Sequence, residues 1–331
     1  MSINLCLFGA GRIGQIHGAN IALHRDATLR YVVDVDAAAA AQLASSLGAK
    51  AADAQAALSD RDVHGVIIAT STDTHLSLIE AAASAGKAVF CEKPLDLDEA
   101  RARRCIDVAA AASIPLYVGF NRRYDPSFRR LKDEIAAGTI GKVEVVSITS
   151  RDPAPPPADY IRRSGGMFRD MTIHDLDMAR WLLGEEPSSV FASGSCLADP
   201  AIGEAGDIDT AVVILQTRGG AFCQVTNSRR CSYGYDQRIE VFGATGMLRA
   251  DNETETRVEL ATSAGFQREP ALPFFLERYR EAYRLELDDF VRALKGEQTG
   301  LADGHDGLRA LILADAAERS RQTGQAVRME Q

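Results

Sequence analysis

The sequence lacks the features that would mark a membrane or secreted protein. No apolar run approaches the roughly 20 residues that a membrane-spanning helix requires, so we expect no membrane segment. A strand-like pattern begins at residue 3, and we therefore expect no signal peptide. The six cysteines are scattered and form no C-x-x-C pair or other familiar zinc spacing. This usage predicts reduced, mostly buried thiols, no metal site and a cytoplasmic location.

Positive charge is also in deficit. Lys and Arg number 37 against 46 Asp and Glu, which gives a formal net charge of −9. This balance argues against nucleic acid or an anionic membrane as the main partner and favours a small-molecule ligand. The chain has 331 residues, 46% of them hydrophobic and 25% charged, and it is long enough for two domains that each bury a core.

The first motif is a glycine turn. The apolar run Ile3 to Phe8 leads into G-A-G-R-I-G, and a helical pattern follows to about His24. A strand, a glycine turn and a helix in this order allow backbone N–H groups and the helix N-terminus to bind a pyrophosphate. The residues predicted to contact the dinucleotide here are Gly9, Gly11, Arg12, Ile13 and Gly14.

A carboxylate follows the second strand pattern. Asp34 and Val35 come directly after the run Leu29 to Val33. Asp34 at the tip of this strand would accept hydrogen bonds from a ribose 2′-hydroxyl and repel a 2′-phosphate, which favours NAD over NADP. The alternatives are that Asp34 only caps the next helix, and that nearby Arg30 accommodates NADP.

Strand and helix patterns alternate as far as residue 120. This alternation predicts a Rossmann-type, doubly wound parallel sheet over residues 1–120. The expected helices include Thr74 to Ala85 and Leu97 to Ala112. Polar residues follow three of the later strands, at the edge where such sheets bind ligands. We predict cofactor contacts there from Thr70, Ser71, Thr72, His75, Glu92, Lys93, Pro94 and Arg122. The hydroxyls at 70–72 are also candidates for helix caps, and Glu92 with Lys93 for a solvated ion pair.

The pattern of residues 121–331 predicts an α+β domain, which we expect to bind the substrate and to form the oligomer. Strand patterns at 189–195, 211–217, 221–227 and 238–242 indicate a large, open and mostly antiparallel sheet. Helices are needed on only one face of such a sheet, so the other face is a candidate oligomer interface. We expect a loop from Gly265 to Pro273 and one helix from about Phe275 to Lys295.

The stretch Gly165 to Trp181 is the strongest candidate for a catalytic segment. If it is helical from about Asp170, then Asp170, His174 and Asp177 share one stripe. Most other positions are apolar, and a buried helix with ionisable groups needs partners or a wet cavity for them. The alternatives are a satisfied His–carboxylate pair in the core, or a metal site, for which no second histidine lies at ligand spacing.

A proline-rich loop precedes this stretch. Four prolines between residues 153 and 157 follow Asp152, and such a stiff loop would form a wall or lid. Further polar candidates are Arg123, Tyr233 and Tyr235. The sequence does not choose between Arg122 and Arg123, or between the two tyrosines, as substrate contacts.

Taken together, the motifs resemble the Gfo/Idh/MocA oxidoreductases, and within them the inositol 2-dehydrogenases. The resemblance covers essentially the whole chain. It rests on G-A-G-R-I-G at 9–14, E-K-P at 92–94, S-R-D-P at 150–153 and G-G-x-F-R-D-M-T-I-H-D-x-D-M-A-R at 165–180. It implies NAD as cofactor, a cyclic polyol as substrate, oxidation of myo-inositol to 2-keto-myo-inositol, and a homotetramer built through the C-terminal sheet.

The resemblance also implies roles for individual residues. Lys93, Asp170 and His174 match the catalytic lysine, carboxylate and imidazole of the family. Asp177 matches a carboxylate that binds ring hydroxyls, while Asp152 falls where relatives carry other polar residues. The chemistry agrees with these roles. Oxidation of a secondary alcohol requires a base whose pKa lies near the working pH, and an unperturbed imidazole has a pKa of roughly 6.5. The alternative functions are a same-family dehydrogenase of another polyol or pyranose and a non-catalytic nucleotide sensor.

Overall fold

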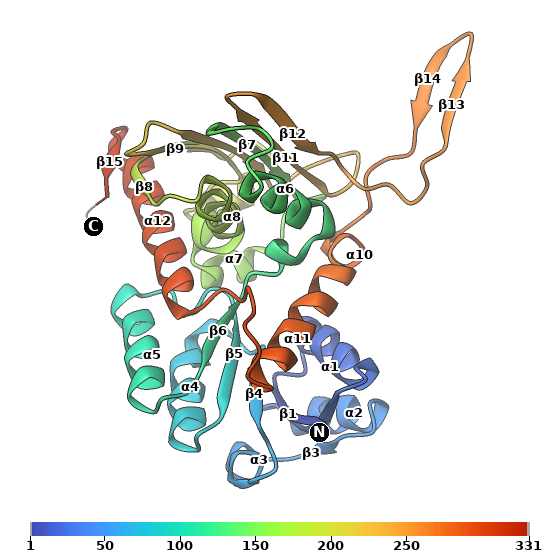
Figure 1. Ribbon diagram of the computed structural model, residues 1–331, viewed down its shortest axis with the longest axis vertical. Coiled ribbons are helices and arrows are strands. Elements are labelled where there is room, and N and C mark those ends of the chain that lie inside the picture. The colour runs from blue at the N-terminus through green and yellow to red at the C-terminus, as the bar shows by residue number, and fades with distance from the viewer. Residues whose placement is uncertain (1, 330–331) are drawn as a thin grey trace. The chain divides into compact units, whose positions relative to one another are not determined.

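The computed structural model describes residues 2–329 and divides into two compact units (Figure 1). The first unit is formed by two segments of the chain, the described residues up to Tyr124 and Ala282–Leu311. The second unit is formed by Asp125–Glu281 and the described residues from Ile312 onward. The predicted combination of a Rossmann-type sheet with a mostly antiparallel second sheet is confirmed. The proposed domain boundary after residue 120 stays a prediction.

The first unit is built on one parallel sheet. Its strand order is β3-β2-β1-β4-β5-β6, and every strand pair in it is parallel. The strands are β1 (Ile3–Phe8), β2 (Ala27–Val33), β3 (Lys50–Ala51), β4 (Gly65–Ile68), β5 (Ala88–Glu92) and β6 (Leu116–Gly119). Strands β4 and β5 are buried along their whole length, as expected for a sheet covered on both faces. All the strands end at the same edge, and this edge therefore collects the predicted cofactor residues.

Helices cover both faces of this sheet. Figure 1 shows α4 and α5 on one face and α1, α2 and α11 on the other. The helices of this unit are α1 (Arg12–Leu23), α2 (Ala37–Ser46), α3 (Ala54–Ser59), α4 (His75–Ser84), α5 (Glu99–Ala111) and most of α11 (Arg280–Leu294), with 3-10 turns at Thr72–Thr74 and Asn121–Tyr124. Phe290 and Val291 of α11 belong to the same buried core as Leu5, Ile67 and Phe90. A segment far along the chain thus completes the first core.

The second unit is built on a mixed sheet. Its order is β12-β11-β7-β10-β9-β8-β15. The strands are β7 (Val143–Arg151), β8 (Pro187–Ser195), β9 (Thr210–Thr217), β10 (Phe222–Ser228), β11 (Asp236–Gly243), β12 (Gly246–Ala250) and β15 (Val327–Arg328). Strands β7 and β10 pair in parallel, and the other pairs are antiparallel. The parallel pair brings the chain after Arg151 beside the chain after Ser228.

Helices lie on one face of this sheet (Figure 1). The helices of this unit are α6 (Pro126–Ala136), α7 (Ala158–Ser164), α8 (Ile173–Leu183), α9 (Pro200–Glu204), α10 (Phe275–Arg278) and part of α12 (Gly304–Thr323). The opposite face carries exposed apolar side chains. The strand register puts them in adjacent rows: Phe191, Val212, Ile214, Phe222, Phe242 and Met247. This surface is called the open apolar face below.

Three local predictions are wrong. Gly265–Arg268 is not loop but strand β14, which pairs with β13 (Glu259–Thr262) in a separate hairpin. The expected single helix from Phe275 is interrupted at Tyr279, so α10 and α11 are separate. The segment Phe168–Thr172 is a π-helix and α8 begins only at Ile173. A π turn holds more residues than an α turn, so Asp170 does not continue the regular stripe of α8.

Candidate active site

The glycine turn has the backbone that a pyrophosphate site requires. Gly9 has φ +102°, and a Cβ there would lie 2.5 Å from the carbonyl oxygen of Ala69. At Gly14 a Cβ would lie 1.9 Å from the oxygen of Gly9, so only glycine allows α1 to start this close to β1. A Cβ at Gly11 would meet nothing within 4 Å, which leaves open space beside the helix N-terminus. The turn therefore fits a dinucleotide phosphate.

Asp34 lies at the tip of β2 and is joined to the glycine turn. Its Oδ2 accepts from the backbone N–H of Ala10 at 2.6 Å, and its Oδ1 from that of Asp36 at 2.8 Å. The cap of α2 is Asp36, whose Oδ1 accepts from two backbone N–H groups of that helix. The alternative that Asp34 only caps the helix is thus excluded. Val35 beside it is fully exposed.

The hydroxyls at the end of β4 do not act as helix caps. Neither Ser71 nor Thr74, the N-cap residues of the two helical segments here, makes a side-chain capping bond. The hydroxyls of Thr70 and Thr74 lie 2.7 Å apart. His75 is fully buried, and its ring nitrogens face backbone carbonyls rather than solvent. Direct contact of any of these residues with a cofactor stays a prediction.

Glu92 and Lys93 come at the end of β5. The carboxylate of Glu92 bonds the ring of His17 over 2.7 Å, so it is not part of a solvated ion pair. Lys93 follows, and Lys93–Pro94 is a cis peptide bond. Arg122 and Arg123 lie in the 3-10 turn after β6, where Arg123 Nη1 is 3.1 Å from Asp306 Oδ2.

In the second unit Asp170 is held by two donors. Its Oδ1 accepts from the hydroxyl of Tyr160 at 2.7 Å, and its Oδ2 from Arg229 Nη2 at 3.1 Å. The guanidinium of Arg229 is buried, while Tyr160 presents 46% of its surface to solvent. Desolvation of the phenol, and then the negative charge of Asp170, raise the pKa of Tyr160. A protonated tyrosine and an arginine thus fix the orientation of this carboxylate.

His174 and Asp177 lie on α8, which the core surrounds. His174 is partly exposed, whereas Asp177 is 1% exposed and lies 3.8 Å from Arg180 Nη1. Between them, Asp175 is fully buried, and its Oδ2 accepts from Asn227 Nδ2 at 2.8 Å. Thr172 donates to the same asparagine at 2.7 Å. Strand β10 therefore anchors the start of α8.

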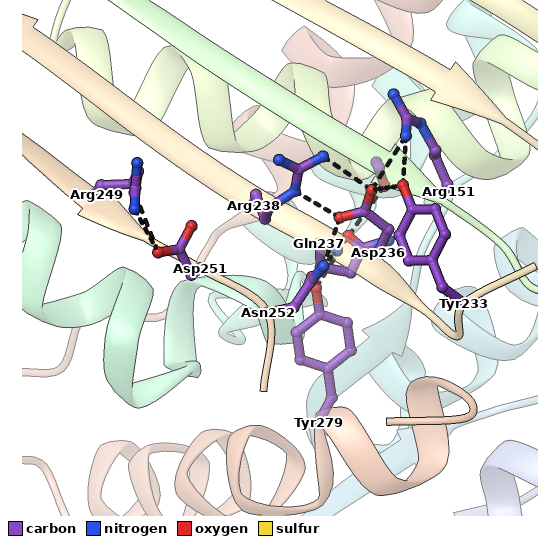
Figure 2. A network of polar contacts seen from close by, with 10 residues as sticks. Arg151, Tyr233, Asp236, Gln237, Arg238, Arg249, Asp251, Asn252 and Tyr279 are labelled. Carbon is purple, nitrogen blue, oxygen red and sulfur yellow. Dashed lines mark hydrogen bonds and ion pairs between the residues drawn. The ribbon is translucent and has the colours of Figure 1, made fainter. Parts of the chain in front are cut away.

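A polar network surrounds the end of β7 (Figure 2). Asp236 is fully buried opposite Arg151 in the strand register, and it accepts from Tyr233 at 2.7 Å and from Arg238 at 2.7 Å. Arg151 donates to the Tyr233 hydroxyl at 2.5 Å. Burial works to raise the pKa of Asp236, but the bonds from its neighbours outweigh burial and lower it. The network fixes the residue before Asp152.

The two candidate tyrosines have different surroundings. The Tyr233 hydroxyl belongs to the network just described. Tyr235 is 5% exposed, and its ring meets those of Phe274 and Tyr279 edge-on at 6.1 and 5.9 Å. Asp152 is partly exposed, and its backbone N–H bonds the oxygen of Ser228 at 2.9 Å. Contact of these side chains with a substrate stays a prediction.

Sequence reasoning missed three residues that hold the predicted site. They are His17, which bonds Glu92, and Tyr160 and Arg229, which bond Asp170. Arg229 lies two positions after the predicted strand 221–227, and this position was the only local signal for it. Within residues 2–329, no group of three His, Cys, Asp or Glu side chains is arranged to hold a metal ion.

Comparison with known proteins identifies the family. Residues 3–120 match the model described as oxidoreductase family, NAD-binding Rossmann fold. Residues 128–249 match the GFO/IDH/MocA C-terminal domain. The chain is 51% identical over 320 residues to the inositol 2-dehydrogenase of Rhizobium meliloti strain 1021, covering 97% of both chains.

The chain belongs to the Gfo/Idh/MocA family of oxidoreductases.

Two further family members are similar over nearly the whole chain. The myo-inositol 2-dehydrogenase of Thermotoga maritima is 48% identical over 327 residues, with 98% of each chain covered. A crystal structure of scyllo-inositol dehydrogenase from Lactobacillus casei, with NAD(H) and scyllo-inositol bound, superposes with a TM-score of 0.91 at 31% identity over 99% of both chains. The first unit is accordingly an NAD-binding Rossmann domain, as the glycine turn indicated. None of the helices described in residues 2–329 is long and apolar enough to cross a membrane.

Proposed function

We propose that the protein is an NAD-dependent inositol 2-dehydrogenase that oxidises myo-inositol to 2-keto-myo-inositol. The observation that carries this proposal is the 51% identity, along 97% of both chains, to a protein named for that activity. The glycine turn, Asp34 and the ordered carboxylate of Asp170 support it independently.

The proposed chemistry divides between three side chains. His174 removes the hydroxyl proton, because an imidazole titrates near the working pH. Asp170 orients that imidazole and stabilises its protonated form; its own position is set by Tyr160 and Arg229. Lys93 hydrogen-bonds the reacting oxygen and balances the negative charge that develops on it.

Cofactor binding is assigned to the carboxyl edge of the first sheet. NAD, when bound, accepts the hydride from the carbinol carbon. The glycine turn binds its pyrophosphate and Asp34 binds a ribose hydroxyl, which favours NAD over NADP. The remaining residues proposed to contact the cofactor are Val35, Thr70, Ser71, Thr72, His75, Glu92, Lys93, Pro94 and Arg122.

The substrate is a ring with many similar hydroxyls. Directional contacts are needed to present one carbon to the nicotinamide in preference to its neighbours. We assign these contacts to Asp152 and Asp177, to Arg122 or Arg123, and to Tyr233 or Tyr235. Arg151 and Tyr233 hold the backbone beside Asp152, which supports its assignment.

A dehydrogenase of another cyclic polyol or a pyranose is the second candidate. It is favoured by the similarity to an enzyme of scyllo-inositol, at 31% identity. The test is steady-state turnover of purified protein with NAD against a panel of inositol isomers and pyranoses. The highest kcat/KM with myo-inositol would support the proposal, and absence of turnover with every inositol would refute it. If the protein were a non-catalytic sensor, NAD would bind but no member of the panel would be oxidised.

The open apolar face supports a homotetramer. A large exposed apolar surface on one side of a sheet marks an interaction site, and the other face of this sheet is already covered by helices. We also propose a cytoplasmic location, which the six free cysteines support. Cell fractionation tests the location, and the tetramer is tested below.

A further inference from the structure

The turn that carries Lys93 is bounded by two buried histidines. Glu92, the residue before the lysine, bonds His17 of α1, and Pro94, the residue after it, bonds His75 of α4. Both histidines are at most 1% exposed. Both contacts lie within the first unit. Neither histidine belongs to the glycine turn or to the proposed catalytic residues.

His17 has one usable ring nitrogen. Its Nε2 lies 2.7 Å from Glu92 Oε1, whereas its Nδ1 is buried without a hydrogen-bond partner among residues 2–329. A proton on Nδ1 would therefore be left unsatisfied, so the neutral ring carries its proton on Nε2 and donates it to the carboxylate. The rings of Phe90 and Tyr283 meet His17 edge-on at 5.5 and 5.6 Å and fix its plane.

The neighbouring strand leaves space for this carboxylate. Glu92 pairs with Gly119 of β6, and a Cβ on that glycine would lie 3.1 Å from Glu92 Oε2. A side chain at 119 would therefore crowd the carboxylate. Gly119 thus leaves room for the carboxylate at the place where His17 donates to it.

His75 holds the other side of the turn. Its Nδ1 lies 3.0 Å from the oxygen of Pro94 and 3.3 Å from that of Leu95, and its Nε2 lies 3.3 Å from the oxygen of Thr70. Burial lowers the pKa of His75, although the three carbonyl groups and Glu92 act to raise it. The neutral ring has a single N–H, and the shortest contact assigns it to Nδ1, which donates to Pro94.

We propose that His17 and His75 are positioning residues that aim Lys93 at the reacting oxygen by fixing the backbone on either side of it. The ammonium group of lysine is carried on a flexible four-carbon stem, and the positions open to it move with the backbone from which that stem starts. Displacement of a catalytic group by about 1 Å can cost roughly a hundredfold in rate. This inference rests on the proposed role of Lys93 in the oxidation.

The test uses amide side chains that place one N–H at different distances from the backbone. The amide nitrogen of Gln imitates Nε2 of His, and that of Asn imitates Nδ1. His17→Gln and His75→Asn therefore keep the donor in place, whereas His17→Asn and His75→Gln move it. All four variants lose the ring, so a general loss of packing affects the two members of each pair alike.

We expect the matched variants to retain kcat to within about threefold of the wild-type protein, and the mismatched variants to lose about tenfold or more. The Kd for NAD, from fluorescence titration, should change by less than about threefold in the His17 pair, because His17 is not among the residues assigned to the cofactor. The His75 pair is compared by kcat at saturating NAD, because His75 is among those residues. Equal kcat for the matched and mismatched member of each pair would overturn the inference. A loss that appears only in the Kd or KM for NAD, with kcat unchanged at saturating NAD, would also overturn it.

The control is His64, whose Nδ1 accepts from the backbone N–H of Asn4 at the opposite edge of the same sheet. His64→Asn and His64→Gln should both keep wild-type kcat, and a tenfold loss in either would show that the losses do not depend on the turn. Lys93→Met separates this inference from the proposed function. Full turnover by that variant would refute the role of the lysine itself. If Lys93→Met is inactive but the matched and mismatched histidine variants have equal kcat, only the positioning by the histidines is refuted.

Discussion

Tyr160 donates a hydrogen bond to Asp170 over 2.7 Å, from a residue ten positions earlier in the chain. The phenol comes from α7, which follows the proline-rich loop, and the carboxylate from the π-helix before α8. Arg229 occupies the other oxygen of Asp170. The proposed orienter of the catalytic base is therefore itself oriented by one neutral and one cationic donor.

Tyr160→Phe should lower kcat about tenfold. It removes one donor from a carboxylate, and a hydrogen bond to a charged group contributes roughly 1.5–3 kcal/mol. The matched control is Tyr31→Phe, which removes a hydroxyl that donates to Asp60 at 2.9 Å in the first unit. Steady-state kinetics with NAD and myo-inositol measure both. Equal kcat in the two variants would show that Tyr160 does not act through Asp170.

Local patterns predicted the first sheet and its cofactor edge, because the residues concerned are neighbours in the sequence. Gly9 to Gly14 and Asp34 each follow directly from the end of an apolar run. These patterns could not predict Arg229 as a partner of Asp170, since it is 59 positions away and lies just beyond β10, whose Asn227 pairs with the start of α8. That pairing depends on tertiary packing, which periodicity does not encode.

The π-helix shows a second limit. Apolar spacing indicated a regular helix from Asp170, but Phe168–Thr172 adopts the wider turn. Thr172 and Asp175 bond Asn227 at the junction, so a tertiary contact with β10 accompanies the change of helix type. Nothing in the spacing of the segment itself specified that contact.

Asp34→Ser should reduce the preference for NAD over NADP by about tenfold or more. The proposed role of the carboxylate is to accept from a ribose hydroxyl and to repel a 2′-phosphate, and serine removes its charge. The ratio of kcat/KM for the two cofactors is the measurement. Asp53→Ser is the control, because it also replaces an aspartate by serine but only at the N-cap of α3. An unchanged ratio in Asp34→Ser would refute the ribose assignment.

Asp209→Asn should destabilise the second unit in a pH-dependent way. Asp209 is fully buried and accepts from the backbone N–H groups of Leu197, Ala198 and Asp199. Burial acts to raise its pKa, but these donors outweigh burial and lower the pKa to about 2. The folded pKa lies below the unfolded value, so the stabilisation is fully present above about pH 4 and is lost as the pH falls towards 2.

The size of this effect follows from the shift. The change from 3.8 to about 2 corresponds to about 2 kcal/mol in the free energy of unfolding at neutral pH. Urea titrations at pH 7 and at pH 3 measure it, and the difference between wild type and Asp209→Asn should shrink at the lower pH. Asp53→Asn, at an exposed helix cap, provides the comparison. A difference that stays constant between the two pH values would contradict the assignment.

Ile214→Lys should dissociate the proposed tetramer. Ile214 is 41% exposed on the open apolar face, and a buried unpaired charge at an interface is costly. Light scattering after size exclusion should give four chains for the wild type and fewer for the variant. Leu23→Lys, at an 86% exposed leucine of α1, should leave the mass unchanged. A wild-type monomer would refute the tetramer.

The proposed hydride transfer from carbon 2 of myo-inositol to NAD can be followed with an isotope. Purified protein is incubated with NAD and myo-inositol that carries deuterium on carbon 2, and the reduced cofactor is analysed by mass spectrometry. We expect one deuterium on the nicotinamide of each NADH formed, together with an equal amount of 2-keto-myo-inositol. NADH without deuterium, or no NADH at all, would contradict it.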